Sequence, residues 1–243
     1  MLITSLDNKK VKLYTSLNDS KNRNINKLFL VMGEHLVKEA LSVNNLVDIL
    51  VLENYELDFD VNMEITYITE PIMKKISKMP SIPKVIGVCK LEENNKLVGN
   101  KILLLDNIQD PGNLGTIIRS SVAFNVDTIV LSNDTVDLYN DKVIRSTQGL
   151  IFHTNIIRRD LVEVVSELKN NNYDILGTNV HNGVELSSIK SNKYALLMGN
   201  EGQGLKEELQ SLCDKNIYIP MNNNCESLNV AVATSIILYE LNK

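Results

Sequence analysis

Cysteines and long apolar stretches are scarce in this 243-residue sequence. Its three cysteines, Cys89, Cys213 and Cys225, are widely spaced and form no CxxC pair. This excludes a disulfide framework and a zinc site of the CxxC type, and indicates a reducing compartment. The apolar run 227–239 has thirteen residues, fewer than the ~18–20 that cross a bilayer, and the first residues are too weakly apolar for a secretory signal. We therefore expect a soluble cytoplasmic protein with no membrane segment and no metal.

An excess of positive charge is also lacking. Lys and Arg number 25 against 30 Asp and Glu, a formal net charge of −5, which argues against a histone-like or tail-driven nucleic-acid binder. Residues 1–96 carry 13 charges of each sign, whereas residues 97–243 carry 12 basic against 17 acidic residues. One basic cluster lies on and after the first expected helix: Lys9, Lys10, Lys12, Lys21 and Arg23. It is either a solvated face or a surface that contacts phosphates.

The first part of the chain alternates between strand and helix patterns. Strands are expected at 27–33, 46–53, 64–69 and 84–90, and helices at 34–41 and 70–78. These elements predict a small α/β sandwich. The polar, poorly periodic stretch 91–100 reads as a linker. We therefore expect two domains, 1–96 and 97–243.

The second part alternates more regularly. Strands are expected at 101–106, 127–132, 173–178, 194–200 and 216–221, and helices at 113–125, 160–171, 205–212 and 227–241. Such alternation predicts a mostly parallel sheet covered by helices on both faces. Ligands of such sheets bind beyond the carboxyl ends of the strands, so the loops that follow the strands are the candidate site.

The loop and helix at 106–121 combine small residues with one charge. On a helical wheel, Asn113 and Arg119 lie on the side opposite the apolar residues. The simpler explanation is an exposed arginine on a helix that Asn113 caps. Pro111, Gly112 and Gly115 favour a functional role, because small residues at a helix start let a ligand approach the backbone.

The second loop, 196–205, is rich in glycine. It matches neither GxGxxG nor GxxxxGK[ST], and Glu201 would repel a phosphate. A neutral or cationic ligand suits it better, although a plain glycine-rich turn is the alternative.

In the third loop and helix, 219–241, Ser227 can serve as the N-cap with Asn229 in the first turn. The helix is apolar nearly all round, so it packs in a core or against another subunit.

Three segments in this order resemble the motifs of the SpoU/TrmH family of RNA ribose 2′-O-methyltransferases, within the SPOUT superfamily. They are N-LG-II-RS at 113–120, MGNEGQGL at 198–205 and IPM…ESLNVAVA at 219–233. RSTQG at 145–149 is similar to an intermediate segment of the family, and 29–41 resembles part of a ribosomal-protein-like RNA-binding domain. Met32, Lys84-Val85 and Asn223 depart from the family pattern.

The resemblance implies a knotted parallel-sheet methyltransferase domain preceded by a small α/β RNA-binding domain. It further implies S-adenosylmethionine as the cofactor, RNA as the substrate and a homodimer formed through the C-terminal helix region. The implied catalytic residues are Arg119, Asn113, Glu201, Ser227 and Asn229. The implied cofactor-binding residues are Thr178, Met198, Gly199, Asn200, Gly202, Ile219, Pro220, Met221 and Leu228. The basic cluster together with Arg145 is the expected RNA-binding set.

The expected reaction is methylation of a ribose 2′-oxygen, with 23S ribosomal RNA favoured and transfer RNA as the alternative. Because a guanidinium stays protonated, we expect Arg119 to bind a neighbouring phosphate and stabilise the developing oxyanion. An RNA-binding module that has lost activity is a second alternative. A Rossmann-type enzyme is disfavoured, because DNIQDPGN stands where its fingerprint would follow the strand at 101–105.

Overall fold

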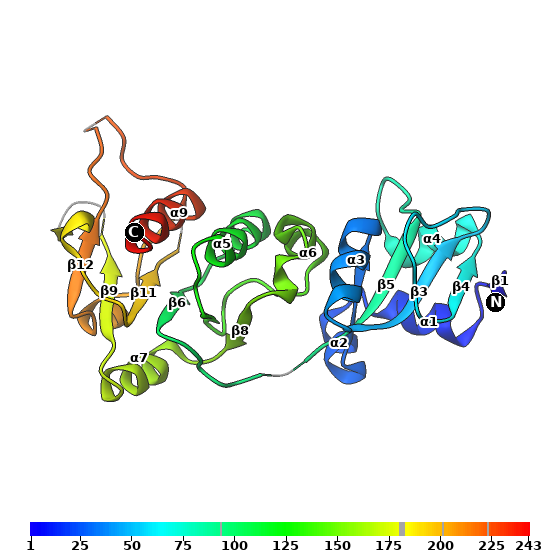
Figure 1. Ribbon diagram of the computed structural model, residues 1–243, viewed down its shortest axis with the longest axis horizontal. Helices are drawn as coiled ribbons and strands as arrows, with labels where there is room; N and C mark the ends of the chain where they lie inside the picture. The colour runs from blue at the N-terminus through cyan, green and yellow to red at the C-terminus, as the bar shows by residue number, and fades with distance from the viewer. Residues whose placement is uncertain (93, 180–182, 201, 223) are drawn as a thin grey trace. The chain divides into compact units, whose positions relative to one another are not determined.

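The computed structural model describes residues 1–92, 94–179, 183–200, 202–222 and 224–243. The chain divides into two compact units (Figure 1), one formed by residues 1–92 with 137–152 and the other by residues 93–136 with 153–243. Both units are α/β. Within the described part of the chain, no helix is long and apolar enough to cross a membrane.

The first unit is built on a mixed five-stranded sheet in the order β1-β4-β3-β5-β2. The strands are β1 (Leu2–Ile3), β2 (Leu28–Met32), β3 (Leu46–Leu52), β4 (Ile65–Ile68) and β5 (Val85–Lys90), and the helices are α1 (Lys9–Ser16), α2 (Ser20–Asn26), α3 (Glu34–Ser42) and α4 (Glu70–Ser77). Along β3, Leu50 belongs to the core under α1 and α4, whereas Ile49 and Val51 belong to the core under α3. Because successive side chains of a strand point to opposite faces of the sheet, β3 contributes to the cores on both faces. The expected sandwich is therefore present, with β1 as an addition.

A segment from the middle of the chain belongs to this first unit. It comprises α6 (Asp141–Thr147) and the short 3₁₀ helix η1 (Leu150–Phe152). The ring of Phe29 lies 4.6 Å from that of Tyr139 and 6.1 Å from that of Phe152, measured between centroids. No local pattern indicates this placement, because it depends on contacts between residues more than 100 positions apart.

The second unit is a fully parallel seven-stranded sheet in the order β10-β12-β9-β11-β6-β7-β8. Its strands are β6 (Lys101–Leu105), β7 (Thr128–Leu131), β8 (Asn155–Arg158), β9 (Asp174–Thr178), β10 (Val184–Glu185), β11 (Tyr194–Met198) and β12 (Lys215–Tyr218). Its α-helices are α5 (Pro111–Ala123), α7 (Leu161–Asn170), α8 (Glu207–Ser211) and α9 (Val230–Leu241), and the 3₁₀ helix η2 (Leu186–Ser188) follows β10. The helices α5 and α9 lie side by side on one face, and α7 covers the other (Figure 1). The predicted parallel sheet is confirmed, and the two edge strands β8 and β10 extend it.

Two helices begin at residues other than those expected. The N-cap of α5 is Asp110, whose Oδ1 accepts a hydrogen bond from the Asn113 backbone N–H at 2.8 Å. The N-cap of α9 is Asn229, whose Oδ1 accepts from the N–H groups of Ala231 and Val232. The expected caps at Asn113 and Ser227 are therefore wrong. In α5 the following Pro111 occupies the first helical position, where a missing N–H costs nothing, which favours Asp110 as the cap.

Candidate functional site

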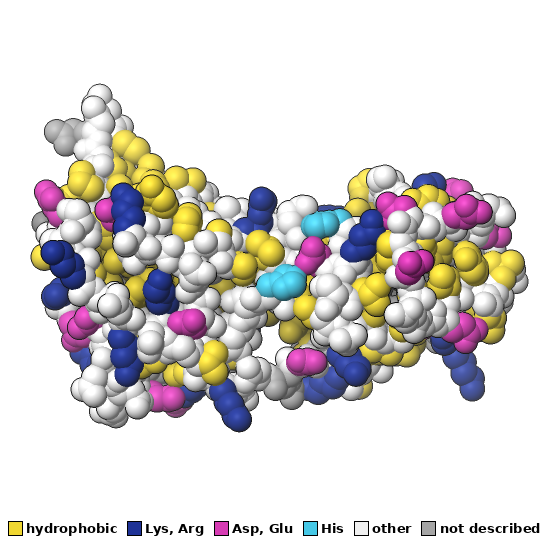
Figure 2. All heavy atoms as spheres, viewed as in Figure 1, with side chains coloured by type: hydrophobic (Ala, Val, Ile, Leu, Met, Phe, Trp, Pro, Cys, Tyr) yellow, Lys and Arg dark blue, Asp and Glu magenta, His cyan; other side chains and the backbone are white. Residues whose placement is uncertain are grey.

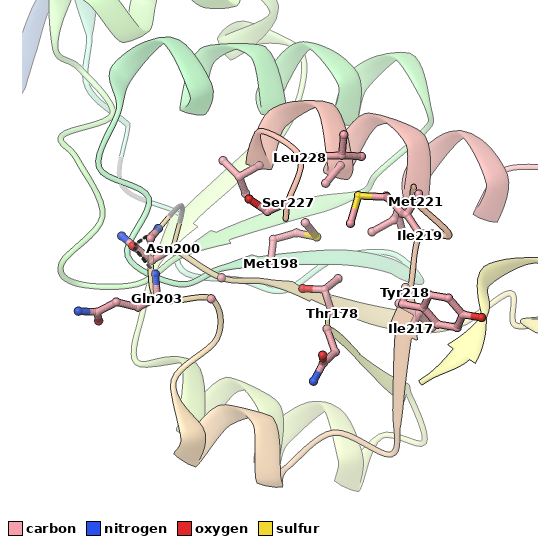
Figure 3. A pocket seen from close by; sticks show the side chains of 17 residues that line it. Thr178, Met198, Asn200, Gln203, Ile217, Tyr218, Ile219, Met221, Ser227 and Leu228 are labelled. Carbon is pink, nitrogen blue, oxygen red and sulfur yellow. Dashed lines mark hydrogen bonds between the residues drawn. The ribbon is translucent and has the colours of Figure 1, made fainter. Parts of the chain in front are cut away.

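A cavity of about 310 Å³ opens in the second unit beyond the carboxyl ends of β9, β11 and β12 (Figure 3). Eight of the nine expected cofactor-binding residues line it: Thr178, Met198, Gly199, Asn200, Gly202, Ile219, Met221 and Leu228. Pro220 is not among the lining residues, whereas Ser227, expected to be catalytic, is. Parallel strands bring these loops together because all their carboxyl ends lie at one edge of the sheet.

The cavity wall has no charge among the described residues. Apart from backbone groups, its polar members are Thr178, Asn179, Asn200, Gln203, Tyr218 and Ser227. Eight of the lining residues are not among those expected from the sequence: Asn179, Gln203, Gly204, Ile217, Tyr218, Val230, Ala233 and Ile237. Seven of them lie in or next to the loops 196–205 and 219–229 or on α9, and Asn179 directly follows β9. A volume near 300 Å³ with an apolar wall and few polar groups is typical of a small-molecule site, and the lack of cationic side chains disfavours a phosphate.

Asn200 organises the loop that forms one wall. Its Oδ1 accepts from the backbone N–H groups of Gly202 at 2.8 Å and Gln203 at 3.2 Å. Its Nδ2 donates to the carbonyl oxygen of Asn107 at 2.8 Å. Asn200 and Gly204 also exchange two backbone hydrogen bonds. The side chain of Asn200 is thus engaged in shaping its own loop and attaching it to the loop after β6.

Two glycines are required by this loop geometry. A Cβ on Gly199 would overlap the backbone carbonyl group of Gly204 and the nitrogen of Leu205. Gly204 itself has φ +71°, a left-handed conformation that side-chain-bearing residues rarely adopt. Glu201, expected to be catalytic, and Asn223 lie outside the described residues.

The first and third motifs meet through an asparagine pair. The Nδ2 of Asn229 donates to the Oδ1 of Asn113 at 2.9 Å, although the residues are 116 positions apart. Nearly two turns farther along the two helices, Ser120 and Ser235 share a hydrogen bond of 2.6 Å. The two bonds join α5 to α9, and the first residue of α9, Val230, lines the cavity.

Arg119 projects from the exposed side of α5. It makes no hydrogen bond and no ion pair with the described part of the chain, whereas Leu114, Ile117 and Ile118 are fully buried on the opposite side. The helical wheel therefore separated the two faces correctly. An exposed guanidinium two turns beyond Asn113 can bind an anion brought by a ligand.

Four members of the expected RNA-binding set have partners within the first unit, and two of them, Arg23 and Lys10, pair with carboxylates that are at least partly buried. Arg23 is only 7% exposed; its Nη1 donates to the carbonyl oxygen of Leu17 at 2.8 Å and its Nη2 pairs with Asp137. Lys10 pairs with the nearly buried Asp48 at 2.7 Å. Arg23 is therefore a structural residue of the interior, a correction to its expected contact with RNA.

The remaining members of that set are exposed to different degrees. Lys12 pairs with Asp7 at 2.9 Å and Arg145 with Asp141 at 3.1 Å. Lys9 and Lys21 are exposed and form no ion pair with any described residue. On the face visible in Figure 2, the Lys and Arg side chains of the first unit are interspersed with Asp and Glu and do not form one continuous basic surface.

A fully parallel sheet, an uncharged cavity beyond its strand ends and an accompanying smaller α/β unit are the features that agree with the methyltransferase class expected from the three motifs. The family model "SpoU rRNA Methylase family" matches residues 100–239, and the model "MRM3-like substrate binding domain" matches residues 8–87. The chain therefore belongs to the SpoU rRNA methylase family.

Relatives cover the whole chain. The 23S rRNA (guanosine(2553)-2′-O)-methyltransferase RlmP of Bacillus subtilis is 38% identical over 98% of both chains. Among solved structures, a putative RNA methyltransferase of the TrmH family from Porphyromonas gingivalis superposes with a TM-score of 0.88 at 26% identity, covering 98% of both chains. An AdoMet-bound rRNA methyltransferase from Sinorhizobium meliloti gives a TM-score of 0.85 at 27% identity and covers 99% of this chain and 97% of its own.

Proposed function

We infer that this protein transfers the methyl group of S-adenosylmethionine to a ribose 2′-oxygen of 23S ribosomal RNA. The observation that carries the inference is the uncharged cavity formed by the second and third motif loops, with the first motif joined to them through Asn113 and Asn229. It lies in a chain that matches a 23S rRNA 2′-O-methyltransferase along 98% of both lengths. We propose that the target is a guanosine equivalent to the one that relative methylates.

The cavity suits the cofactor by chemistry as well as size. S-adenosylmethionine carries no phosphate, so an adenosine-binding wall needs no lysine or arginine, and none lines the cavity among the described residues. We propose that Thr178, Met198, Ile219, Met221 and Leu228 enclose the apolar parts of the cofactor. The backbone groups near Gly199 would provide its hydrogen bonds.

When bound, S-adenosylmethionine would supply an activated methyl group on its sulfonium. The ribose oxygen would displace S-adenosylhomocysteine from this methyl group, and the hydroxyl proton would pass to solvent water. Most of the acceleration comes from positioning. We propose that Arg119 holds a neighbouring phosphate and stabilises negative charge on the oxygen, while Asn113, Ser227 and Asn229 position the reacting groups. Glu201 is retained as a catalytic candidate on the family resemblance alone.

We propose that the first unit binds the RNA. Lys9 and Lys21 are the exposed lysines of the original cluster without an internal partner among the described residues, so they are the strongest phosphate contacts. Lys12 and Arg145 can contribute by exchanging a surface carboxylate for a phosphate, since exposed ion pairs are weak. Transfer RNA remains the alternative substrate, and a tRNA-modifying enzyme of Aquifex aeolicus matches 59% of this chain at a TM-score of 0.51.

A homodimer formed through the C-terminal helix is part of the proposal. On α9, Val232, Ile236 and Tyr239 are 48%, 40% and 54% exposed. Their spacing of four and three residues places them on one stripe. A partner that covers this stripe would remove apolar area from water. Light scattering of the wild type and of Ile236→Glu tests it: a dimer that the substitution dissociates supports the interface, and a wild-type monomer at micromolar concentration contradicts it.

Two further expectations belong to the same proposal. We propose that the C-terminal segment forms the trefoil knot of SPOUT proteins and that the protein acts in the cytoplasm, where ribosomal RNA is located. The knot is tested by limited unfolding of the intact chain, followed by the refolding kinetics of residues 93–243. The location is tested by fractionation of cells with ribosomes as the marker.

The deciding experiment maps ribose 2′-O-methylation across total RNA with and without the gene. The expected result is the loss of one methyl group in 23S rRNA, restored by the wild-type gene and not by Arg119→Ala. Loss of a methyl group in a transfer RNA instead would establish the alternative substrate. No change in any RNA would favour an inactive binding module.

A further inference from the structure

A buried carboxylate lies directly beneath the loop that forms the cavity wall. Asp106, at the end of β6, is 1% exposed. Its Oδ2 accepts from the backbone N–H of Lys206 at 3.2 Å, and its Oδ1 lies 3.1 Å from the Lys206 ammonium nitrogen. Oδ1 has no hydrogen bond from any other described group. One lysine therefore serves both oxygens of Asp106, through its backbone and through its side chain.

The lysine also contacts a second, exposed carboxylate. The Nζ of Lys206 lies 2.8 Å from Oδ2 of Asp134, in the loop after β7. Hydrogen bonding to Asp134, followed by the pairing with Asp106, raises the pKa of Lys206, and the same contact lowers the pKa of Asp134. The ammonium is thus charged throughout the physiological range. The loops after β11, β6 and β7 converge on this one group.

The same three loops are also joined by hydrogen bonds that do not involve Lys206. Asn107, the residue after Asp106, accepts from Asn200 through its carbonyl oxygen and donates its N–H to Ser132 Oγ at 2.8 Å. Ser132 in turn donates to Asp134. The loop that leads into α5, and therefore to Asn113 and Arg119, is in this way attached to the cavity wall.

The energetic balance at Asp106 depends on Lys206. An ionised carboxylate removed from water is costly unless it is paired, and removing one partner of such a pair costs far more than the pair itself contributes. Without the ammonium, the buried Asp106 carboxyl group would take up a proton, draw water in or move. Each of these changes alters the contacts next to Asn107, whose carbonyl oxygen anchors Asn200.

We propose that Lys206 is a positioning residue for the methyl donor: by neutralising Asp106 it holds Gly199, Asn200 and residues 202–206 in the shape that binds the cofactor. It acts through the loop and does not line the cavity. This inference rests on the proposed function in so far as the ligand is S-adenosylmethionine. It predicts that loss of Lys206 weakens cofactor binding more than it slows transfer in the fully loaded enzyme.

The test is the variant Lys206→Met, which keeps the length of the side chain and removes its charge. Calorimetry with S-adenosylhomocysteine on the purified full-length protein should show a dissociation constant raised about tenfold. This is only part of the cost of an unpaired buried charge, because Asp106 affects the ligand through the loop and does not contact it. The KM for S-adenosylmethionine should rise in parallel, while kcat at saturating cofactor stays within about threefold and RNA affinity is unchanged.

Two further variants separate positioning from folding. Lys206→Arg keeps the charge and should restore most of the affinity. Asp106→Asn combined with Lys206→Met removes the unpaired carboxylate and should recover part of it, even if Lys206→Met alone is too unstable to measure. Lys169→Met removes another partly exposed lysine, which lies 3.0 Å from the partly exposed Asp214 and away from the cavity lining, and should leave cofactor binding unchanged.

The outcomes test the proposed function and the role of Lys206 separately. A wild-type protein that does not bind S-adenosylhomocysteine contradicts the proposed function. A wild-type protein that binds it, with Lys206→Met binding equally well, overturns the role of Lys206. So does a loss of kcat without a change in affinity, or a loss of affinity that neither Lys206→Arg nor the double variant relieves.

Discussion

The side-chain amide of Asn229 donates to the Oδ1 of Asn113 at 2.9 Å, while the Oδ1 of Asn229 caps α9. One residue therefore ends the loop of the third motif, starts the last helix and holds the first motif. This double use explains why asparagine suits the position: aspartate would lack the donor and serine would lack the second polar group.

Replacing the two asparagines should have separable effects. Asn229→Ala removes a helix cap and should lower the free energy of unfolding by about 1 kcal/mol as well as impairing methyl transfer. Asn113→Ala leaves both caps in place, because Asp110 caps α5, and should impair transfer with a stability change below about 0.5 kcal/mol. Urea unfolding and a radiolabelled transfer assay measure both; equal destabilisation by the two variants would contradict this division.

Arg119→Ala should lower the rate of methyl transfer steeply without affecting stability or cofactor binding. The side chain is exposed and has no partner among the described residues, so its removal leaves no buried group unpaired. Loss of a group that stabilises an oxyanion costs roughly 10²–10³ in rate. Calorimetry with S-adenosylhomocysteine and a single-turnover transfer assay form the test. Retained turnover would show that another group handles the 2′-hydroxyl.

Two glycines of the same loop should respond differently to alanine. Gly199→Ala places a methyl group against the backbone of Gly204, so the loop must shift and cofactor affinity should fall at least tenfold. At Gly202 the added Cβ would meet only the Asn200 Oδ1, at an ordinary 3.5 Å, and the loss should be much smaller. Isothermal titration of both variants makes the comparison. A larger effect at Gly202 would mean that the ligand approaches that residue most closely.

Arg23→Met should destabilise the first unit. It leaves Asp137 and the Leu17 carbonyl without their charged partner, at a cost of about 3 kcal/mol. The double variant Lys9→Ala/Lys21→Ala should leave unfolding unchanged, weaken RNA binding and reduce its salt dependence. Thermal unfolding and filter binding at several salt concentrations distinguish the two cases. If the lysine pair is silent in RNA binding, those residues form only a solvated face.

Tyr194 should make the second unit sensitive to alkali. Burial, with the charge of Asp127 as a lesser cause, raises the pKa of Tyr194 to about 12, above the ordinary value near 10. The stability linked to its proton is thus fully present below about pH 10 and is lost as the pH rises towards 12. The hydroxyl of Tyr194 is buried without a partner among the described residues. The free energy of unfolding of Tyr194→Phe should therefore equal that of the wild type or exceed it by about 1 kcal/mol. It should also show a shallower decline in stability between pH 10 and 12, measured by urea titration.

The strands of the parallel sheet and the loops of the candidate site could be predicted because their signals are local. Apolar runs such as 101–105 and 194–198 are typical of strands buried on both faces, and glycine-rich turns identify the loops that follow. The helical wheel separated Arg119 from the buried face of α5 for the same reason. Periodicity and turn chemistry need only neighbouring residues.

The sequence by itself determined the alternation of strands and helices, the parallel sheet and the three loops at its carboxyl edge. The tertiary structure decided which polar groups are free to act. Arg23 became an interior residue through Asp137, Asn229 rather than Ser227 became the helix cap, residues 137–152 joined the first unit, and Lys206 became the partner of Asp106. The reason is physical: most of these outcomes depend on burial and on pairing between groups about 100 residues apart, whereas composition and periodicity report only on short range.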